Sequence, residues 1–141
     1  MQIRECTAAD VMLLAAMNKR LIEDEKSSNP MSIAELEDRM SGFLSGSYNA
    51  YLFEENKTAI GYALVDHSRE PLYLRQFYIE REHRRKAYGV NAFRLLTEHL
   101  RTDRIDIDVL SHNEAGRAFW RKCGFSETCI SMRYERRDNN G

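Results

Sequence analysis

The segment "LYLRQFYIEREHRRKAYGVNAFRLLTEHLRTDRIDIDV", residues 72–109, contains two strand-like runs on either side of a helix-like run. Residues 72–79 are rich in aromatic and apolar side chains, and residues 104–110, "RIDIDVL", alternate between polar and apolar. Between them, Phe93, Leu96 and Leu100 recur at helical spacing. Such a strand, helix and strand are long enough to form a right-handed parallel crossover. The segment therefore predicts an α/β fold.

Within this segment, "REHRRKAYG" (residues 81–89) lies between the first strand and the helix. The start of a helix leaves backbone N–H groups unpaired, and the helix dipole adds to their attraction for an anion. Arg84, Arg85 and Lys86 add positive charge, and Gly89 allows a close approach to the backbone. A basic cluster is also typical of a solvated helix start. The stretch alone leaves both interpretations open.

The residues before this segment predict a strand, two helices and a hairpin. Residues 2–6 alternate as a strand, Thr7 with Asp10 forms a capping-box pattern, and an apolar helical stripe runs to Ile22. "EDEKSSNP" (23–30) is expected to be a loop, and Ser32 with Glu35 caps a second helix. Residues 49–55 and 58–66 read as a hairpin around the weak turn signal "NK".

The residues after it predict a further helix and the last strands. "NEAGRAFWRKCG" (113–124) reads as a helix closed by Gly124, and "FSETCISMRYER" (125–136) as one or two strands. Together these elements predict a mixed sheet of about six or seven strands flanked by about four helices.

Composition limits the classes of function. The 141 residues fit a single domain, 1–141, without repeats or a linker, and the formal net charge is −1. That charge disfavours nucleic acid and anionic membranes as partners. The three cysteines match no metal-binding pattern, and the N-terminus lacks the apolar core of a signal peptide. We therefore expect a cytoplasmic protein without a metal.

Two motifs in this element order carry a resemblance to a known family. Arg84-x-x-Ala87-x-Gly89 resembles the acetyl-coenzyme A loop of the GCN5-related N-acetyltransferase (GNAT) superfamily, which follows that family's fourth strand. "NEAGRAFWRKCGF" (113–125) resembles the family's Asn-led helix that ends in Gly-Phe. The resemblance covers nearly the whole chain. It implies a sheet splayed between strands four and five, with acetyl-CoA entering the splay.

By the same resemblance, strand four contributes backbone contacts to the pantetheine arm, with an N–H there polarising the thioester carbonyl. The loop amides hold the pyrophosphate, and Asn113 contacts the pantetheine or the edge of the cofactor. The cofactor-binding residues so implied are Phe77, Tyr78, Ile79, Arg84, Arg85, Lys86, Ala87, Tyr88, Gly89, Val90 and Asn113.

Two residues depart from the family pattern. Ala87 stands where the family usually has glycine, and a left-handed conformation of alanine costs about 1–2 kcal/mol. We therefore predict right-handed geometry at Ala87, and a positive φ would count against the loop assignment. Trp120 aligns with the tyrosine that many members use to protonate the departing thiolate. An indole N–H is no useful proton source, but a thiol of pKa about 8.5 can take its proton from water.

The acceptor amine needs a base, because an alkylamine of pKa about 10.4 is protonated at pH 7 and deprotonation costs about 4–5 kcal/mol. Glu80 and Asp108 are candidates for this base, and Asp106 shares one strand face with Asp108. Glu23 and Glu25 would give the acceptor site an acidic mouth. For each carboxylate the alternative is a solvated surface group.

The resemblance thus implies an acetyl-CoA-dependent N-acetyltransferase in which a primary amine of a small molecule or peptide attacks the thioester directly. Trp120 also motivates an alternative, an acyl-CoA-binding sensor with weak or lost catalysis. The expected partners are acetyl-CoA and an amine, and a homodimer is compatible with the resemblance. The identity of the amine stays open.

Overall fold

A computed structural model describes residues 1–138, apart from the side chains of Arg85 and Lys86. The elements, in chain order, are β1 (Gln2–Glu5), the 3-10 turn η1 (Ala8–Asp10), α1 (Val11–Asp24), α2 (Ile33–Ser45), β2 (Tyr48–Glu55), β3 (Thr58–Asp66), β4 (Leu72–Ile79), the 3-10 turn η2 (Arg81–Lys86), α3 (Tyr88–Leu100), β5 (Ile105–Asp106) and α4 (Glu114–Lys122). The predicted order of strand, two helices, hairpin and crossover is confirmed.

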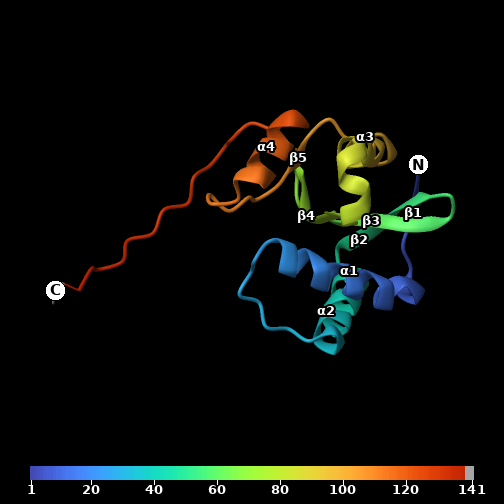
Figure 1. The fold of residues 1–141 in the computed structure, drawn as a ribbon, viewed down its shortest axis with the longest axis horizontal. Helices are drawn as coiled ribbons and strands as arrows, with labels where there is room; N and C mark the ends of the chain where they lie inside the picture. The colour runs from blue at the N-terminus through green and yellow to red at the C-terminus, as the bar shows by residue number, and fades with distance from the viewer. Residues whose placement is uncertain (139–141) are drawn as a thin grey trace.

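The five strands form one sheet in the order β1-β2-β3-β4-β5 (Figure 1). The first four strands are antiparallel to their neighbours. Only β5 lies parallel to β4, because α3 carries the chain back across the sheet between them. The parallel crossover predicted from residues 72–109 is therefore present.

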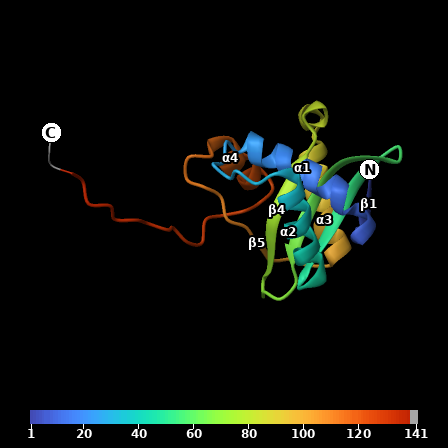
Figure 2. The same cartoon turned by 90° about the horizontal axis from the view of Figure 1, so that it is seen from below.

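Helices cover both faces of the sheet, α1 and α2 on one side and α3 and α4 on the other (Figures 1 and 2). Leu14, Met17 and Met40 of the first pair pack against strand residues such as Leu52 and Leu64. On the opposite face, the core consists of β-strand side chains and the apolar stripe of α3, including Phe53, Val65, Leu74, Ala92, Phe93 and Leu96.

Local sequence signals account for the element boundaries. Both capping boxes form, Thr7 with Asp10 and Ser32 with Glu35. In the hairpin, Asn56 and Lys57 have φ values of 51° and 65°, the positive values that a type I′ turn requires at both central positions. The hairpin therefore forms although lysine replaces the usual glycine.

The number of strands was predicted wrongly. The sheet has five strands, β5 contains only Ile105 and Asp106, and residues 125–138 form no strand. In both views the C-terminal segment runs away from the body of the protein (Figures 1 and 2). Its alternating Ile130, Met132 and Tyr134 side chains are 76%, 92% and 87% exposed. Alternation favours a strand only where a neighbouring strand supplies the hydrogen bonds.

The end of α1 also differs from the prediction, since the helix continues through Glu23 to Asp24 instead of ending before "EDEKSSNP". Within the part of the chain that the structure describes, no helix is long and apolar enough to cross a membrane.

Candidate functional site

The edge of β4 that faces β5 is open along most of its length. β5 pairs with β4 only at Leu72–Ile105 and Tyr73–Asp106 within the described residues. The Glu80 N–H donates to the Ile60 carbonyl oxygen on β3 at 2.8 Å. Because backbone groups alternate along a strand, those of Tyr78 also face β3, whereas those of Phe77 and Ile79 face the open edge. These two residues are thus the ones whose backbones can bind a ligand in the gap.

The loop after β4 brings α3 to the end of this edge. The first-turn N–H groups of α3, at Tyr88, Gly89 and Val90, have no intrahelical partner because they begin the helix. The three N–H groups are therefore available at the end of the open β4 edge.

Ala87 between η2 and α3 has φ 60° and ψ 17°, so the prediction of right-handed geometry is wrong. The residue joins two helical segments of different direction, and a left-handed residue makes that change of direction. By the criterion stated above, this positive φ counts against the phosphate loop. The position is nevertheless the one at which the resembling motif has glycine, and here alanine adopts the glycine conformation at a cost of about 1–2 kcal/mol.

The side chain of Arg84 is bound within the protein. Its guanidinium pairs with Asp24 at the end of α1, its Nε donates to the Ile79 carbonyl oxygen at 2.8 Å, and it lies 5.4 Å from the Tyr78 ring. Arg81 Nη2 also donates to Asp24 Oδ1 at 2.5 Å. Partial burial opposes ionisation of Asp24, but the hydrogen bonds from Arg84 and Arg81 outweigh it and lower the pKa of Asp24. Arg84 and Arg81 therefore anchor the loop to α1.

Two further residues of this connection, His83 in η2 and Gly89 in the first turn of α3, lie against aromatic side chains. The Nδ1 atom of His83 is buried and has no hydrogen-bond partner among the described residues, and the ring meets Tyr88 edge-on at 5.3 Å. Gly89 is buried, and a Cβ atom there would lie 2.9 Å from Cε1 of Phe119. Gly89 is thus required for the contact between α3 and α4. The predicted contacts of the Arg85 and Lys86 side chains lie outside the described residues.

The α4 residues that the sequence singled out have structural partners. Asn113 is the N-cap of α4, with its Oδ1 accepting the Gly116 N–H at 2.9 Å. Trp120 lies in an aromatic cluster whose other members are Phe77, Phe93, Phe119 and Phe125. The size of the indole is thus explained by packing.

The predicted carboxylates do not form one cluster. Glu80 pairs with Arg20 at 2.6 Å and accepts a hydrogen bond from the Tyr78 hydroxyl at 3.2 Å. Asp108 accepts one from the Tyr73 hydroxyl at 2.7 Å. Asp106 and Asp108 are both exposed, as is Glu23. Within residues 1–138, no group of three or more His, Cys, Asp or Glu side chains could hold a metal ion.

A cleft of about 270 Å³ lies between α1, α2 and β4. It is lined by Asn18, Leu21, Ile22, Glu25, Ser27, Arg39, Tyr73, Arg75 and Gln76. Of the predicted acceptor-binding residues, only Glu25 lines it. Glu25 as a residue is exposed, but desolvation of its carboxyl and the neighbouring charge of Asp24 raise the pKa of Glu25.

The polar cleft residues of α1, α2 and β4 were not among those predicted from the sequence. A signal for part of the set was present, because Arg75 and Gln76 interrupt an otherwise aromatic and apolar strand in "LYLRQFYI". Arg39 and Asn18 lie on amphipathic helices, where polar residues are expected, and nothing in their spacing distinguishes them.

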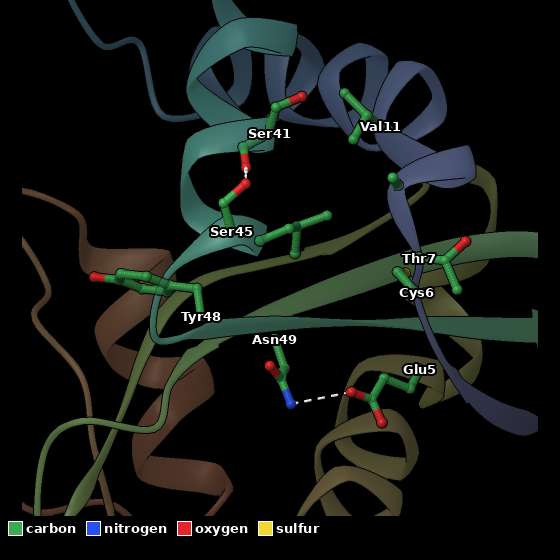
Figure 3. Close-up of a pocket in the computed structure, with 10 residues that line it drawn as sticks. Glu5, Cys6, Thr7, Val11, Ser41, Ser45, Tyr48 and Asn49 are labelled. Carbon is green, nitrogen blue, oxygen red and sulfur yellow. Dashed lines mark hydrogen bonds between the residues drawn. The ribbon is translucent and has the colours of Figure 1, made fainter.

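A second cleft, of about 240 Å³, lies between β1, α2 and the start of β2 (Figure 3). The side chains of Cys6, Ser41, Ser45 and Tyr48 are among those that line it, and Asn49 donates to Glu5 at 3.0 Å. None of the residues predicted for the site lines this cleft.

Comparisons with known proteins identify the family and the fold. Residues 14–125 match the model of the acetyltransferase (GNAT) family. A search of curated proteins found no significant match.

Among solved structures, a possible acetyltransferase from Clostridium difficile 630 has a TM-score of 0.77 at 15% identity, with 98% of each chain covered. The apo aminoglycoside antibiotic 6'-N-acetyltransferase from Acinetobacter haemolyticus has a TM-score of 0.73 at 16% identity, covering 99% of this chain and 100% of that one. A predicted acetyltransferase from Clostridium acetobutylicum, solved with acetyl-CoA, has a TM-score of 0.71 at 19% identity, with 95% of each chain covered. At these identities the structures show a shared fold.

Proposed function

The chain belongs to the acetyltransferase (GNAT) family, and from this premise we propose that it transfers an acetyl group from acetyl-CoA to a primary amine by direct attack in a ternary complex. The observation that carries the proposal is the open edge of β4, which presents the backbones of Phe77 and Ile79 beside the N-terminus of α3.

The residues around this edge fit acetyl-CoA. A pantetheine arm is an amide chain, and it can pair with the backbone of Phe77 and Ile79 as a neighbouring strand would. The first-turn N–H groups of α3 suit a pyrophosphate. The buried, unpartnered Nδ1 atom of His83 is a further polar group beside this path. Because Asn113 Oδ1 caps α4, its Nδ2 group is the part left for a pantetheine contact.

The acceptor would approach from the cleft between α1, α2 and β4. When the amine forms its C–N bond, the carbonyl oxygen would gain negative charge, which the N–H of Ile79 or Phe77 would stabilise. Collapse of this intermediate would break the C–S bond, and the departing thiolate would take its proton from water. Glu25 would take the amine proton. Its raised pKa makes it a stronger base than an ordinary glutamate, and it directly follows Asp24, which anchors the donor loop.

Glu80 and Asp108, the bases predicted from the sequence, fit this role less well. Glu80 would first have to leave its ion pair with Arg20 at 2.6 Å. Asp108 is already engaged as the acceptor of the Tyr73 hydroxyl at 2.7 Å. The sensor alternative rested on Trp120, and packing explains that residue without reference to catalysis. We therefore favour the enzyme.

Binding tests the donor site. Acetyl-CoA at 100 times its dissociation constant should add about 2.7 kcal/mol of stability, and free adenine nucleotides at the same concentration less. Mass spectrometry of reactions with a panel of amines should then show an added acetyl group. If acetyl-CoA did not raise the Tm of the protein, the proposal would be refuted.

A backbone substitution tests the catalytic N–H. Proline in place of Ile79 removes an N–H that faces the open edge and contributes nothing to the β3–β4 ladder. Ile79→Pro should therefore lower kcat by about 10²–10³-fold if this group stabilises the oxyanion. Ile79→Val, which keeps the N–H, is the matched control and should retain most activity. Equal rates for the two variants would exclude this N–H from catalysis.

A further inference from the structure

We propose that the acceptor amine also carries an anionic group, which is a carboxylate or a phosphate ester. Arg39 and Arg75 bind this group in the cleft between α1, α2 and β4. It is called the oxyanion below and is distinct from the charged carbonyl oxygen of the reaction. This inference rests on the proposed acetyl transfer and narrows the class of its acceptor.

The first observation is an uncompensated pair of positive charges. Arg39 and Arg75 both line the cleft, and their guanidinium carbons lie 5.6 Å and 5.0 Å from the ring centre of Phe43. Neither has a carboxylate within ion-pair distance among the described residues, whereas Arg20, Arg81 and Arg84 each have one. Two neighbouring guanidinium groups repel each other until an anion lies between them, and their planar donor sets match carboxylate and phosphate oxygens.

The second observation is an unsatisfied donor. Nε of Arg39 is buried and has no hydrogen-bond partner among the described residues, although Nη2 of the same group donates to Asn18 Oδ1 at 3.0 Å. Asn18 is only 1% exposed, so this contact holds the guanidinium in a fixed orientation. A buried N–H without a partner is unfavourable. The guanidinium of Arg39 therefore keeps unused hydrogen-bonding capacity at the wall of the cleft.

The third observation is the way in which β4 presents Arg75. Leu74 pairs with Val65 and Gln76 pairs with Leu64, so Arg75 is the extra residue of a bulge. A bulge interrupts the alternation of a strand and redirects its side chains. As a result, Arg75 and Gln76, although adjacent in sequence, both line the cleft.

The remaining charges of the cleft suit a zwitterion. Glu25 lines the same cleft and would face the ammonium group, while the two arginines would face the oxyanion. The volume of about 270 Å³ suits a small molecule of the size of an amino acid or an aminoalkyl phosphate. A polyamine would place further positive charge beside Arg39 and Arg75. The cleft therefore selects against polycationic acceptors.

The test compares matched acceptors. Acetyl-CoA turnover is measured with amino acids against their amides, and with phosphoethanolamine against ethanolamine; spermine serves as the polycation. We expect kcat/KM for the preferred oxyanion-bearing series to exceed that for its neutral counterpart by roughly 10–100-fold, the effect of one charge-assisted contact. The series that is turned over identifies the oxyanion as a carboxylate or a phosphate.

Variants connect this preference to the arginines. Arg75→Gln should lower kcat/KM for the oxyanion-bearing acceptor and so remove the preference over its neutral counterpart, and Arg75→Lys should restore part of it. Arg75 is exposed, so its replacement is compatible with folding. Arg104→Gln is the matched control, because Arg104 is an exposed arginine that does not line the cleft, and it should keep the preference.

A calorimetric titration separates this inference from the proposed function. N-acetylated products with a free carboxylate or phosphate should bind the native protein at least about 10-fold more tightly than their neutral analogues, and Arg75→Gln should abolish the difference. Equal binding and equal turnover of both members of each pair would overturn the oxyanion site, even with acetyl transfer intact. Arg75-dependent binding without any turnover would support the anion site and overturn the acetyl transfer.

Discussion

Ala87→Gly should stabilise this protein, although glycine in the interior of a helix is destabilising. Ala87 has φ 60° and ψ 17°, a left-handed conformation that costs an alanine about 1–2 kcal/mol and costs glycine nothing in steric terms. Glycine gives back about 0.5–1 kcal/mol because its unfolded chain is more flexible. The net gain should be about 0.5–1 kcal/mol. The side chain is exposed, so no packing is lost.

The assay is thermal unfolding of the variant and the parent protein. An unfolding entropy of about 2.1 cal/mol/K per residue, applied to 141 residues, gives about 0.3 kcal/mol/K, so Tm should rise by about 2–3 °C. Lys57→Gly, at φ 65° in the hairpin turn, should give a similar rise. Ala34→Gly replaces an exposed alanine in the first turn of α2 and should lower the free energy of unfolding, by up to about 1 kcal/mol.

The three variants distinguish relief of left-handed strain at Ala87 from the ordinary cost of glycine in a helix. A decrease in Tm for Ala87→Gly comparable to that for Ala34→Gly would refute the left-handed geometry and with it the strain assigned to the loop. If the loop keeps its conformation when acetyl-CoA binds, the same increment in Tm should be seen in saturating acetyl-CoA. An increment that disappears on binding would show that Ala87 leaves the left-handed region in the complex.

Three further predictions concern the charges and packing of the site. Glu25→Gln should remove the acid limb of the pH profile of kcat/KM, which should lie above the ordinary glutamate pKa of 4.5, because desolvation and Asp24 raise the pKa of Glu25. Asp24→Asn should destabilise the protein in urea at pH 7, and progressively less as the pH falls below 3.8. Partial burial opposes ionisation of Asp24, but hydrogen bonds from its arginine partners outweigh it and lower the pKa of Asp24. The stabilisation is therefore complete above the ordinary value of 3.8 and is lost as the pH falls through the lower folded value. Gly89→Ala should cost about 1–3 kcal/mol in thermal unfolding, because the new Cβ would lie 2.9 Å from Phe119, and Phe119→Leu should recover part of that loss.

Local signals in the sequence were sufficient for most of the secondary structure. The capping pairs Thr7 with Asp10 and Ser32 with Glu35 mark helix starts because each satisfies unpaired backbone groups within four residues. Gly124 ends α4 with φ 105°, as its position predicts. These features depend only on residues that are close in sequence, so they can be predicted from the sequence alone.

The strands at the C-terminal end show where local signals fail. "RIDIDVL" and "FSETCISMRYER" both alternate, yet the first yields a strand of two residues and the second none within the described residues. A strand exists only where another strand offers hydrogen bonds, and the composition of a segment does not say whether such a neighbour is present.

The sequence by itself determined the crossover of residues 72–109, the family resemblance and the place of the loop between β4 and α3, because these follow from the order and spacing of residues along the chain. Only the tertiary structure decided which groups surround the cleft between α1, α2 and β4. Glu25 at the C-cap of α1, Arg39 of α2 and Arg75 of β4 are far apart in sequence, and they meet because the helices pack across the sheet. The left-handed conformation of Ala87 was also decided only by the tertiary structure, because it follows from how η2 and α3 are joined.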